Sequence, residues 1–298
     1  MNKKIAILLA SYNGIKYIKE QIDSILYQKE VEITIFISDD LSTDNTLKYL
    51  QNTYKDEKRL IYLKDNEKIG GAAKNFYRLI RDVDFSNFDY ISLSDQDDIW
   101  YENKLIEAIK TIKEKQVDIY SSNVTAFWED GKEVLIDKSQ SQKEYDFLFS
   151  SAGPGCTYVM KKEFLVNFKT QMFKKDFLLK NIDLHDWLLY AYARTKNYKW
   201  FIDPIPLMLY RQHSNNEFGA NSGFVTFKKR WLLARNGWYR KQILNIANFC
   251  DLENKITNAI KNNTFMDRLY LISNIFKLRK KISESIVLFF ILVIPGFK

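Results

Sequence analysis

The sequence predicts an α/β protein with a mostly parallel central sheet flanked by helices, and three observations favour this class. Short apolar runs alternate with stretches of helical spacing, which is the order expected of a parallel sheet covered by helices. Polar residues follow several of the apolar runs at the point where each run ends. At 298 residues and 46% hydrophobic content, the chain is long enough for one large domain or two smaller ones with a substantial core.

The alternation is clearest in the first part of the chain. Continuous apolar runs such as residues 5–10 are typical of strands that are buried on both faces. We expect strands at 5–10, 33–37, 60–63 and 90–93. We expect helices at 17–28, 47–54, 72–80 and 103–115, where apolar residues recur three and four positions apart.

The second half has mixed periodicity. Residues 117–127 and 156–160 are strand-like, 184–193 is helical, 207–210 is a short strand, and the chain from 224 onward is mostly helical. The boundary is expected at 221–223. The prediction is therefore an α/β part, residues 1–220, and a basic, mainly helical extension, residues 221–298.

Polar residues that follow three of the expected strands predict a site. The groups are 11–13, 38–40 and 94–98. Ligands bind beyond the carboxyl ends of the strands in sheets of this kind, so all three groups are expected at one rim. Helix capping explains each group singly but does not explain the convergence of all three.

The segment Asp95-Gln96-Asp97-Asp98 places three carboxylates within four positions. Such a cluster repels itself unless a cation or solvent compensates. Mg²⁺ and Mn²⁺ prefer oxygen ligands, so a divalent metal is one interpretation and a solvated acidic turn is the other. The whole chain has two cysteines, which are far apart, and two histidines, so it has no disulfide framework and few ligands for a zinc site of the usual kind.

The net charge of +8 is unevenly distributed. Residues 221–298 contain 14 Lys and Arg against 4 Asp and Glu, a balance of +10, so the first 220 residues carry −2. The basic groups at 228–230 and 279–281 stand among aromatic residues, and the apolar run 286–294 is too short to span a bilayer. We expect contact with the cytoplasmic membrane surface or with a second subunit, and a helical subdomain packed on the body is the alternative. No motif supports nucleic-acid binding.

Common phosphate-binding motifs are absent. The chain has no G-x-x-x-x-G-K-[ST] loop, and Gly153 and Gly155 lack the third glycine of a dinucleotide fingerprint. No G-x-S-x-G elbow occurs either. A cation held by acidic residues would provide the screening that a bound diphosphate needs.

Five motifs in order resemble glycosyltransferase family 2, and the last two are similar to its bacterial rhamnosyltransferase-like members. They are residues 9–14 (LASYNG), 38–44 (SDDLSTD), 95–100 (DQDDIW), 185–187 (HDW) and 210–213 (YRQH) with Asn216 and Gly219. The match covers about residues 3–220. The resemblance implies a GT-A fold with a Rossmann-like nucleotide half and an acceptor half. It also implies a nucleoside-diphosphate sugar donor, a divalent metal (Mn or Mg) and inversion at the anomeric carbon.

The resemblance also implies residue roles. Asp186 matches the catalytic base. The donor nucleotide would meet Ala10, Ser11, Tyr12, Asn13, Asp40, Gly70, Lys74, Asp95 and Gln96. The metal would be held by Asp97, Asp95 and His213. The diphosphate or the acceptor would meet Arg211, His185, Trp187, Gly153 and Gly155. For several of these, such as Lys74, Trp187 and the two glycines, a solvated, core or turn role remains the alternative.

The predicted function is inverting transfer of a sugar, with rhamnose as the candidate, from a dTDP or UDP carrier to a surface polysaccharide or a lipid-linked glycan. The expected location is cytoplasmic and peripheral on the inner face of the cell membrane. A non-catalytic nucleotide-sugar-binding or scaffold protein of a polysaccharide assembly complex is the alternative. A nucleotidyltransferase, which would release pyrophosphate, is a third possibility.

Overall fold

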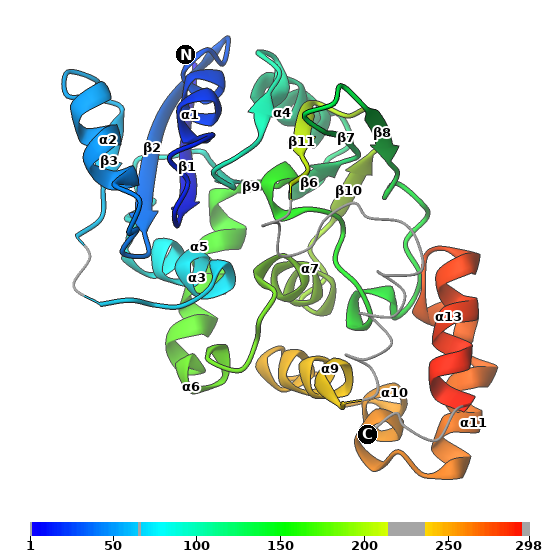
Figure 1. Cartoon of the computed structure of the whole chain (residues 1–298). Coiled ribbons are helices and arrows are strands. Elements are labelled where there is room, and N and C mark those ends of the chain that lie inside the picture. The colour runs from blue at the N-terminus through cyan, green and yellow to red at the C-terminus, as the bar shows by residue number, and fades with distance from the viewer. Residues whose placement is uncertain (1, 65–66, 214–235, 294–298) are drawn as a thin grey trace.

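The computed structural model describes residues 2–64, 67–213 and 236–293 (Figure 1), and its centre is a seven-stranded sheet. The strands are β1 (Lys3–Ser11), β2 (Val31–Asp39), β3 (Leu60–Tyr62), β4 (Tyr90–Ser94), β6 (Ile119–Ser122), β9 (Val159–Lys161) and β10 (Trp200–Asp203). Their order is β10-β6-β9-β4-β1-β2-β3. Only β9 is antiparallel to its neighbours, so the expectation of a mostly parallel sheet is confirmed.

Helices cover both faces of this sheet. Those before the C-terminal region are α1 (Ile18–Leu26), α2 (Thr46–Thr53), α3 (Ala72–Asp82), α4 (Lys104–Glu114), α5 (Lys162–Lys174), α6 (Asp176–Leu179) and α7 (His185–Thr195). Ala6 and Leu8 of β1 join the core under α3, α5 and α7, whereas Ile5, Ile7 and Leu9 join the core under α1 and α4. Two buried faces explain why the β1 sequence is apolar without alternation.

The register of the sheet aligns the ends of its central strands. Ser11 of β1 is paired with Asp39 of β2, and Leu9 is paired with Ser94 of β4. The loops that follow these three strands therefore start from one edge of the sheet.

A second, four-stranded sheet has the order β5-β11-β7-β8. Its strands are β5 (Ile99–Trp100), β7 (Val124–Phe127), β8 (Glu133–Ile136) and β11 (Met208–Arg211). The single strand expected at 117–127 is wrong, because the chain leaves the large sheet at Asn123 and enters the small one. The Asn123 side chain donates to Pro204 O (3.0 Å) and accepts from Lys138 N (2.7 Å). These two bonds take the place of backbone strand pairing where the chain passes from one sheet to the other. The strand expected at 156–160 begins only at Val159, after a 3₁₀ turn at Gly155–Thr157.

The described C-terminal region is helical, as expected. It consists of α9 (Trp238–Phe249), α10 (Lys255–Asn262), α11 (Phe265–Ser273), α12 (Ile275–Leu278) and α13 (Ile282–Val293). Ile243, Phe249, Ile260 and Leu288 belong to the same hydrophobic cluster as α3, α5 and α7. The expected boundary at 221–223 lies outside the described residues. Within those residues, no helix combines the length and the apolar character that crossing a bilayer requires.

Candidate functional site

A cleft of about 1360 Å³ lies at the carboxyl ends of the central strands. The three polar groups expected at one rim do meet there. Among the residues that line the cleft are fourteen expected at the site: Ala10, Ser11, Tyr12, Asn13, Asp40, Gly70, Asp95, Gln96, Asp97, Gly153, Gly155, His185, Asp186 and His213. Asp97 and Asp186 therefore face one cavity rather than separate pockets.

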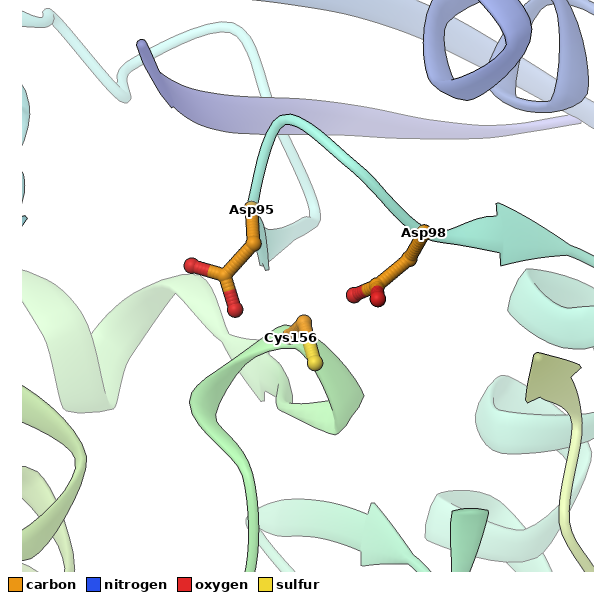
Figure 2. Close-up of side chains that lie close together, drawn as sticks. All are labelled: Asp95, Asp98 and Cys156. Carbon is orange, nitrogen blue, oxygen red and sulfur yellow. The ribbon is translucent and has the colours of Figure 1, made fainter. Parts of the chain in front are cut away.

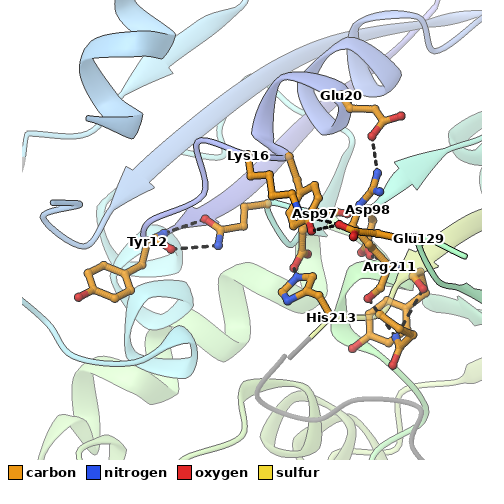
Figure 3. Close-up of polar contacts among 12 residues, drawn as sticks. Tyr12, Lys16, Glu20, Asp97, Asp98, Glu129, Arg211 and His213 are labelled. Carbon is orange, nitrogen blue, oxygen red and sulfur yellow. Dashed lines mark hydrogen bonds and ion pairs between the residues drawn. The ribbon is translucent and has the colours of Figure 1, made fainter. Parts of the chain in front are cut away.

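The Gln96 side chain joins the loops after β1 and β4 by a reciprocal pair of hydrogen bonds with the Tyr12 backbone, as in the pairing of two strands. The Tyr12 N–H donates to Gln96 Oε1 (2.9 Å), and Gln96 Nε2 donates back to Tyr12 O (3.0 Å; Figure 3). A Cβ at Gly14 would overlap the Gln96 amide, so a larger residue there would push this amide away from the Tyr12 backbone. Gln96, expected to contact the nucleotide, thus holds the Tyr12 backbone in place.

The loops after β1 and β2 are also joined. Asn13 Oδ1 accepts from Thr43 N (2.8 Å), and Asn13 N donates to the Ser42 hydroxyl (2.8 Å). Asp39 accepts from Ser42 N (2.7 Å) and from the Ser11 hydroxyl (3.1 Å). These contacts fix the first loop, which leaves the Tyr12 side chain exposed toward the cleft.

Asp40 is buried and bonded to the loop before α3. Its carboxylate accepts from the backbone N–H of Ile69 and of Gly70 (2.9 Å for Gly70). Near it, Lys68 Nζ lies 3.0 Å from the Tyr12 hydroxyl and 4.6 Å from the centre of the Tyr12 ring. The cleft wall here combines an aromatic ring, an amine and a buried carboxylate.

Asp97 and His213 form a polar pair in the cleft. His213 Nε2 lies 2.8 Å from Asp97 Oδ2, and the two side chains are mostly buried (Figure 3). The Tyr17 ring stacks on His213 with 5.2 Å between ring centres. A carboxylate oxygen and an imidazole nitrogen at this separation can both turn toward one cation, so the residues fit a divalent metal site.

Arg211 does not line the cleft, in contrast to the expectation that it contacts diphosphate. Its guanidinium pairs with Glu20 and donates from Nε to the Asp97 carbonyl (2.8 Å; Figure 3). The Tyr17 ring centre lies 4.6 Å from the same guanidinium. Arg211 therefore supports the Asp97 loop, and its guanidinium is paired with Glu20 of α1.

Asp98 is fully buried and does not cap the helix that follows. Its Oδ1 accepts from Arg211 N (3.1 Å), and ligand atoms of Asp95, Asp98 and Cys156 lie within 4.8 Å of one another (Figure 2). Burial, followed by the charges of Asp97 and Asp95, raises the pKa of Asp98 well above its ordinary range. Burial also raises the pKa of the Cys156 thiol. A bound cation would lower both pKa values, so this cluster offers ligand atoms to a cation beside those of Asp97 and His213.

Asp186 stands in the first turn of α7 and lines the same cleft. Its Oδ1 accepts from Trp187 N (2.7 Å), and burial raises the pKa of its carboxyl to about 6. The raised pKa suits a general base that works near neutral pH. Trp187, the next residue along the helix, points away from the cleft and is buried, and its indole N–H donates to Phe147 O (2.8 Å). The expected acceptor contact of Trp187 is therefore replaced by a core position.

His185 lies beside Asp186 and is packed tightly. Its ring stacks on Phe76 with 4.0 Å between centres, and burial lowers its pKa to about 3. Within the described part of the chain, its buried Nε2 has no hydrogen-bond partner. A Cβ at Gly155 would lie 2.6 Å from this nitrogen, so Gly155 is what allows α7 to approach the 3₁₀ turn.

The C-terminal region holds the wall around Asp186 in place. Lys280 Nζ donates to Ser151 O (3.0 Å), Lys281 Nζ donates to Asp137 O (2.6 Å), and Arg279 donates to Phe149 O. Ser151 itself and Lys138, the neighbour of Asp137, line the cleft. The basic group 279–281, expected at an anionic surface, is thus turned inward; the group 228–230 lies outside the described residues.

Helix α9 secures the segment that leads into α7. The Trp238 indole N–H donates to Asp183 Oδ2 (2.7 Å), and Gln242 accepts from Asp183 N (3.0 Å). The Tyr239 hydroxyl donates to Phe149 O (2.6 Å). Two aromatic residues expected at a membrane are therefore bonded to the catalytic part.

Sequence reasoning missed several residues of the cleft and misplaced one more. Lys16, Tyr17, Lys68, Glu129, Lys138, Ser151 and Asp183 line it without standing in any motif. Glu129 follows β7 and bonds to Lys16 and Tyr17 at the cleft, a contact that joins residues more than 110 positions apart. Lys74, expected at the nucleotide, does not line the cleft, and its neighbour Asn75 does so instead. The pair Asp130-Gly131 after Glu129 is a turn signal that could have located this residue.

Comparison with known proteins shows the family to which the chain is similar. Residues 6–219 match the family model described as glycosyl transferase family 2. The chain is 47% identical to "dTDP-rhamnosyl transferase RfbG" of Shigella flexneri over 290 residues, covering 97% of this chain and all of that protein.

Two solved structures have a similar fold. The S. aureus TarS fragment 1–349 in complex with UDP-GlcNAc gives a TM-score of 0.55 at 18% identity, over 95% of this chain and 78% of that one. The Pyrobaculum calidifontis mannosyltransferase PcManGT in complex with GDP-Man and Mn²⁺ gives 0.53 at 14% identity, over 98% and 84%. At these identities the likeness concerns the fold.

Proposed function

The chain belongs to glycosyltransferase family 2, and we propose that it transfers a rhamnosyl group from dTDP-rhamnose, with inversion, to a glycan of a cell-surface polysaccharide. The choice of donor is supported by the Shigella relative, which is similar over nearly the whole chain and is named for that transfer. The acceptor is a growing or lipid-linked glycan, and the enzyme works peripherally at the inner face of the cell membrane.

The observation that carries the proposal is the presence of Asp97, His213 and Asp186 in one cleft. Inverting transfer needs a carboxylate that takes the proton of the acceptor hydroxyl as this attacks the anomeric carbon. Asp186 is that base. With a pKa of about 6, its carboxylate is mainly ionised at neutral pH and still accepts a proton readily.

Asp97 and His213 are the residues that would hold a divalent cation, with Mn²⁺ or Mg²⁺ as the candidates. When bound, such an ion neutralises charge that develops on the departing diphosphate. Arg211 and Tyr17 keep this pair in place by their contacts with the Asp97 carbonyl and the His213 ring. Asp95 would provide a second metal contact beside this pair or a contact with the ribose.

The nucleotide occupies the side of the cleft formed by Tyr12, Asp40 and Lys68. The Tyr12 ring offers a flat apolar surface to a base, and the buried Asp40 carboxylate can accept from a pyrimidine N–H. Lys68 lies over the Tyr12 ring and brings a positive charge to the same wall. Thymine and uracil both carry the N–H that this arrangement recognises.

The acceptor occupies the side formed by Lys138, Ser151, Gly153 and His185. His185 is neutral at physiological pH because its pKa is so low, so its imidazole can exchange hydrogen bonds with sugar hydroxyls. Gly153 has φ +150°, and the absence of a Cβ lets its backbone lie against the Lys138 side chain at this wall.

The test is a panel of nucleotide sugars, each with Mn²⁺ or Mg²⁺, measured by thermal shift and by product analysis. A bound donor raises the melting temperature with its affinity, so dTDP-rhamnose should give the largest shift and UDP-glucose a smaller one. Turnover should release dTDP. Release of pyrophosphate would mean nucleotidyl transfer instead, and a larger shift and faster turnover with another donor would exclude rhamnose as the sugar.

A further inference from the structure

We propose that the Trp128 ring is the stacking surface for a second sugar unit of the acceptor, so that this enzyme prefers glycans of two or more units. The proposal rests on the proposed function, which places the acceptor in the same cleft. It adds a binding position and a preferred acceptor length. We call the position over the Trp128 ring the outer subsite.

Trp128 differs from the other tryptophans that the structure describes, because its ring lines the cleft. Trp100, Trp187 and Trp200 are buried in the two hydrophobic clusters. The indole of Trp238 is bonded to the segment that leads into α7. Trp128 is only half-buried. A large aromatic side chain that the core does not use, held at a cleft, is available to a ligand.

One face of the small sheet forms a wall of the cleft, and Trp128 continues this face. Successive side chains of a strand point to opposite faces, and residues that are paired between strands share a face. Tyr210 is paired with Ala126, and Ile136 is paired with Val124. Trp128 comes two residues after Ala126 and therefore shares the same face. Tyr210, Ile136 and Trp128 accordingly all line the cleft.

The two neighbours of Trp128 in the chain hold its backbone in place. Phe127 belongs to the opposite face of the sheet, where the Arg211 guanidinium lies 4.5 Å from the centre of the Phe127 ring. Glu129 accepts a hydrogen bond from the Tyr17 hydroxyl (2.8 Å). The position of Trp128 is thus set without a ligand, which reduces the entropy that binding must cost.

Trp128 lies on the far side of the metal pair from the nucleotide. Tyr12, at the proposed nucleotide side, follows β1 of the large sheet, whereas Asp97 stands just before β5 of the small sheet. Trp128 follows β7, which is two strands beyond β5 in the order β5-β11-β7, or about 10 Å at the usual strand spacing. In Figure 3, Tyr12 and Glu129, the neighbour of Trp128, lie on opposite sides of Asp97. This separation favours the acceptor over the donor as the ligand of Trp128.

The distance along the sheet favours a second sugar unit over the one that reacts. Lys138 lies against Gly153 at the acceptor wall, and Ile136 precedes it by two residues on β8. The residue paired with Ile136 stands four positions before Trp128, which is about 13 Å along an extended strand. This is longer than one pyranose ring. A sugar whose hydroxyl meets Asp186 from the acceptor wall therefore leaves the Trp128 ring to the next unit.

The surroundings of the ring favour a sugar over a lipid chain. One face of a pyranose presents C–H groups that pack on an aromatic surface, while the hydroxyls at its rim need polar partners. Lys132 Nζ lies 5.0 Å from the centre of the Trp128 ring, and Glu129 and Asp130 line the cleft beside it. An amine and two carboxylates can bond to sugar hydroxyls, whereas a hydrocarbon chain would leave them without partners.

The test compares acceptors of one and two units in the parent enzyme and in Trp128→Ala. The probes are p-nitrophenyl glycosides of rhamnose and of N-acetylglucosamine, each as a mono- and a disaccharide, with dTDP-rhamnose and Mn²⁺. The parent should use the better disaccharide with a kcat/KM about tenfold or more above that of its monosaccharide, because one aromatic contact is worth about this factor. Trp128→Ala should remove the preference by raising the KM of the disaccharide at unchanged kcat, and Trp128→Phe should keep most of it.

The matched control is Leu135→Ala, which removes an exposed side chain (54%) from the opposite face of the same hairpin. This variant should have parental KM values for both probes. Equal losses in Leu135→Ala and Trp128→Ala would overturn the proposal, and so would a parent enzyme without a length preference. A smaller thermal shift with dTDP-rhamnose in Trp128→Ala would also overturn it, since the ring would then contact the donor.

Fluorine NMR of the full chain labelled with 5-fluorotryptophan gives a readout that does not depend on turnover. The Trp128 signal is the one that Trp128→Phe lacks. In the presence of dTDP and Mn²⁺, the disaccharide probes should shift this signal and the monosaccharides should not. A Trp128 signal that no disaccharide shifts would overturn the outer subsite.

The outcome is separable from that of the proposed function. A Trp128 signal that responds to disaccharides, in a protein that dTDP-rhamnose neither stabilises nor serves as donor, would overturn only the donor assignment. Consumption of dTDP-rhamnose with a Trp128 signal that ignores every disaccharide would overturn only the outer subsite.

Discussion

The Asp186 carboxylate is kept in a position that disfavours its charge. Burial raises its pKa from 3.8 to about 6, so at neutral pH the folded protein holds an ionised group at a cost. In the unfolded chain the same group ionises freely. The shift of about two pKa units corresponds to at most ~3 kcal/mol of lost stability above pH 6, less after screening by solvent in the cleft.

Replacing Asp186 with Asn should therefore abolish transfer and stabilise the fold. We expect the turnover rate to fall about 10²- to 10⁴-fold and the free energy of unfolding at pH 7 to rise by about 1–3 kcal/mol. Turnover assays and denaturant unfolding measure the two effects. Asp176→Asn, at an exposed position on α6, is the control and should change neither. A variant with parental turnover would show that Asp186 is not the base.

The pH dependence of transfer provides a second test of the same residue. The base acts only when ionised, so the rate should be flat above pH 7 and should fall about tenfold per unit below pH 6. The measurement is the rate at saturating donor between pH 4.5 and 8. A profile whose acid limb lies near pH 4 would mean that the carboxyl with the raised pKa is not the group that controls turnover.

His213 should matter for metal affinity more than for chemistry. His213→Gln removes the imidazole that faces Asp97 at 2.8 Å. We expect the Mn²⁺ concentration at half-maximal activity to rise about tenfold or more, with activity partly restored at high metal. Metal titration of the activity measures this. If removal of the divalent ion by a chelator leaves the parent enzyme fully active, the metal assignment is wrong.

At the scale of single elements, residues 279–281 connect the C-terminal helices to the cleft. Lys280 is buried and its pKa is lowered to about 8 by burial. The unfolded chain therefore binds more protons than the folded one between pH 8 and 10.5, and stability should rise with pH in that window. Below pH 8 the buried charge opposes folding.

Lys280→Met removes this titration while keeping the length of the side chain. From pH 7.5 to 9.5, the free energy of unfolding of the parent protein should rise by on the order of 1–3 kcal/mol more than that of the variant. Denaturant unfolding at the two pH values measures it. Lys277→Met, an exposed lysine one turn earlier, is the control and should show no such gain. Equal pH dependence in parent and Lys280→Met would mean that Lys280 is charged in the fold without penalty.

The elements of the nucleotide half could be predicted from sequence because their signals are local. Apolar runs and helical spacing indicated β1, β2, β3 and β4 and the helices between them. The expected strand 117–127 failed because nothing local marks the point where the chain changes sheets; the bond from Asn123 to Pro204 spans 81 positions. Pairings of that length depend on tertiary packing rather than on composition.

At the scale of the whole molecule, the catalytic part and the C-terminal helices share one hydrophobic cluster. Ile243, Phe249 and Leu288 pack with residues of α3, α5 and α7. Because this packing depends on the fold, the basic and aromatic composition of the region could not predict that Trp238 and Lys280 bond to the first part of the chain. Composition indicated the charge of the region, and only the fold determines which of its faces meets the body.

Deleting residues 236–298 should therefore prevent stable folding of residues 1–235. The deletion removes about a dozen buried apolar side chains from the shared cluster, each contributing about 1.5–3 kcal/mol when fully buried. We expect loss of a cooperative thermal transition by circular dichroism, whereas the full chain should melt in one step. A shortened chain that melts cooperatively and responds to dTDP would show that the first part folds independently.

The site was more predictable than its supports. Motif residues such as Asp97 and Asp186 were expected and line one cleft, but Arg211 and Trp187 were assigned to ligands and instead hold protein groups. Long polar and aromatic side chains beside a site have many possible partners. Which partner is used depends on neighbours such as Glu20 and Phe147 that are distant in sequence.

The reciprocal amide pairing of Gln96 with the Tyr12 backbone has a consequence for redesign. The two loops are bonded to each other, and Gly14 leaves room for those bonds. When loop sequences are exchanged between related enzymes, the two loops should therefore be exchanged together. A chimaera that imports a first loop with a bulkier residue at position 14, or a second loop that lacks Gln96, would lose both bonds at once. Donor preference in this scaffold should be transplanted with both loops together.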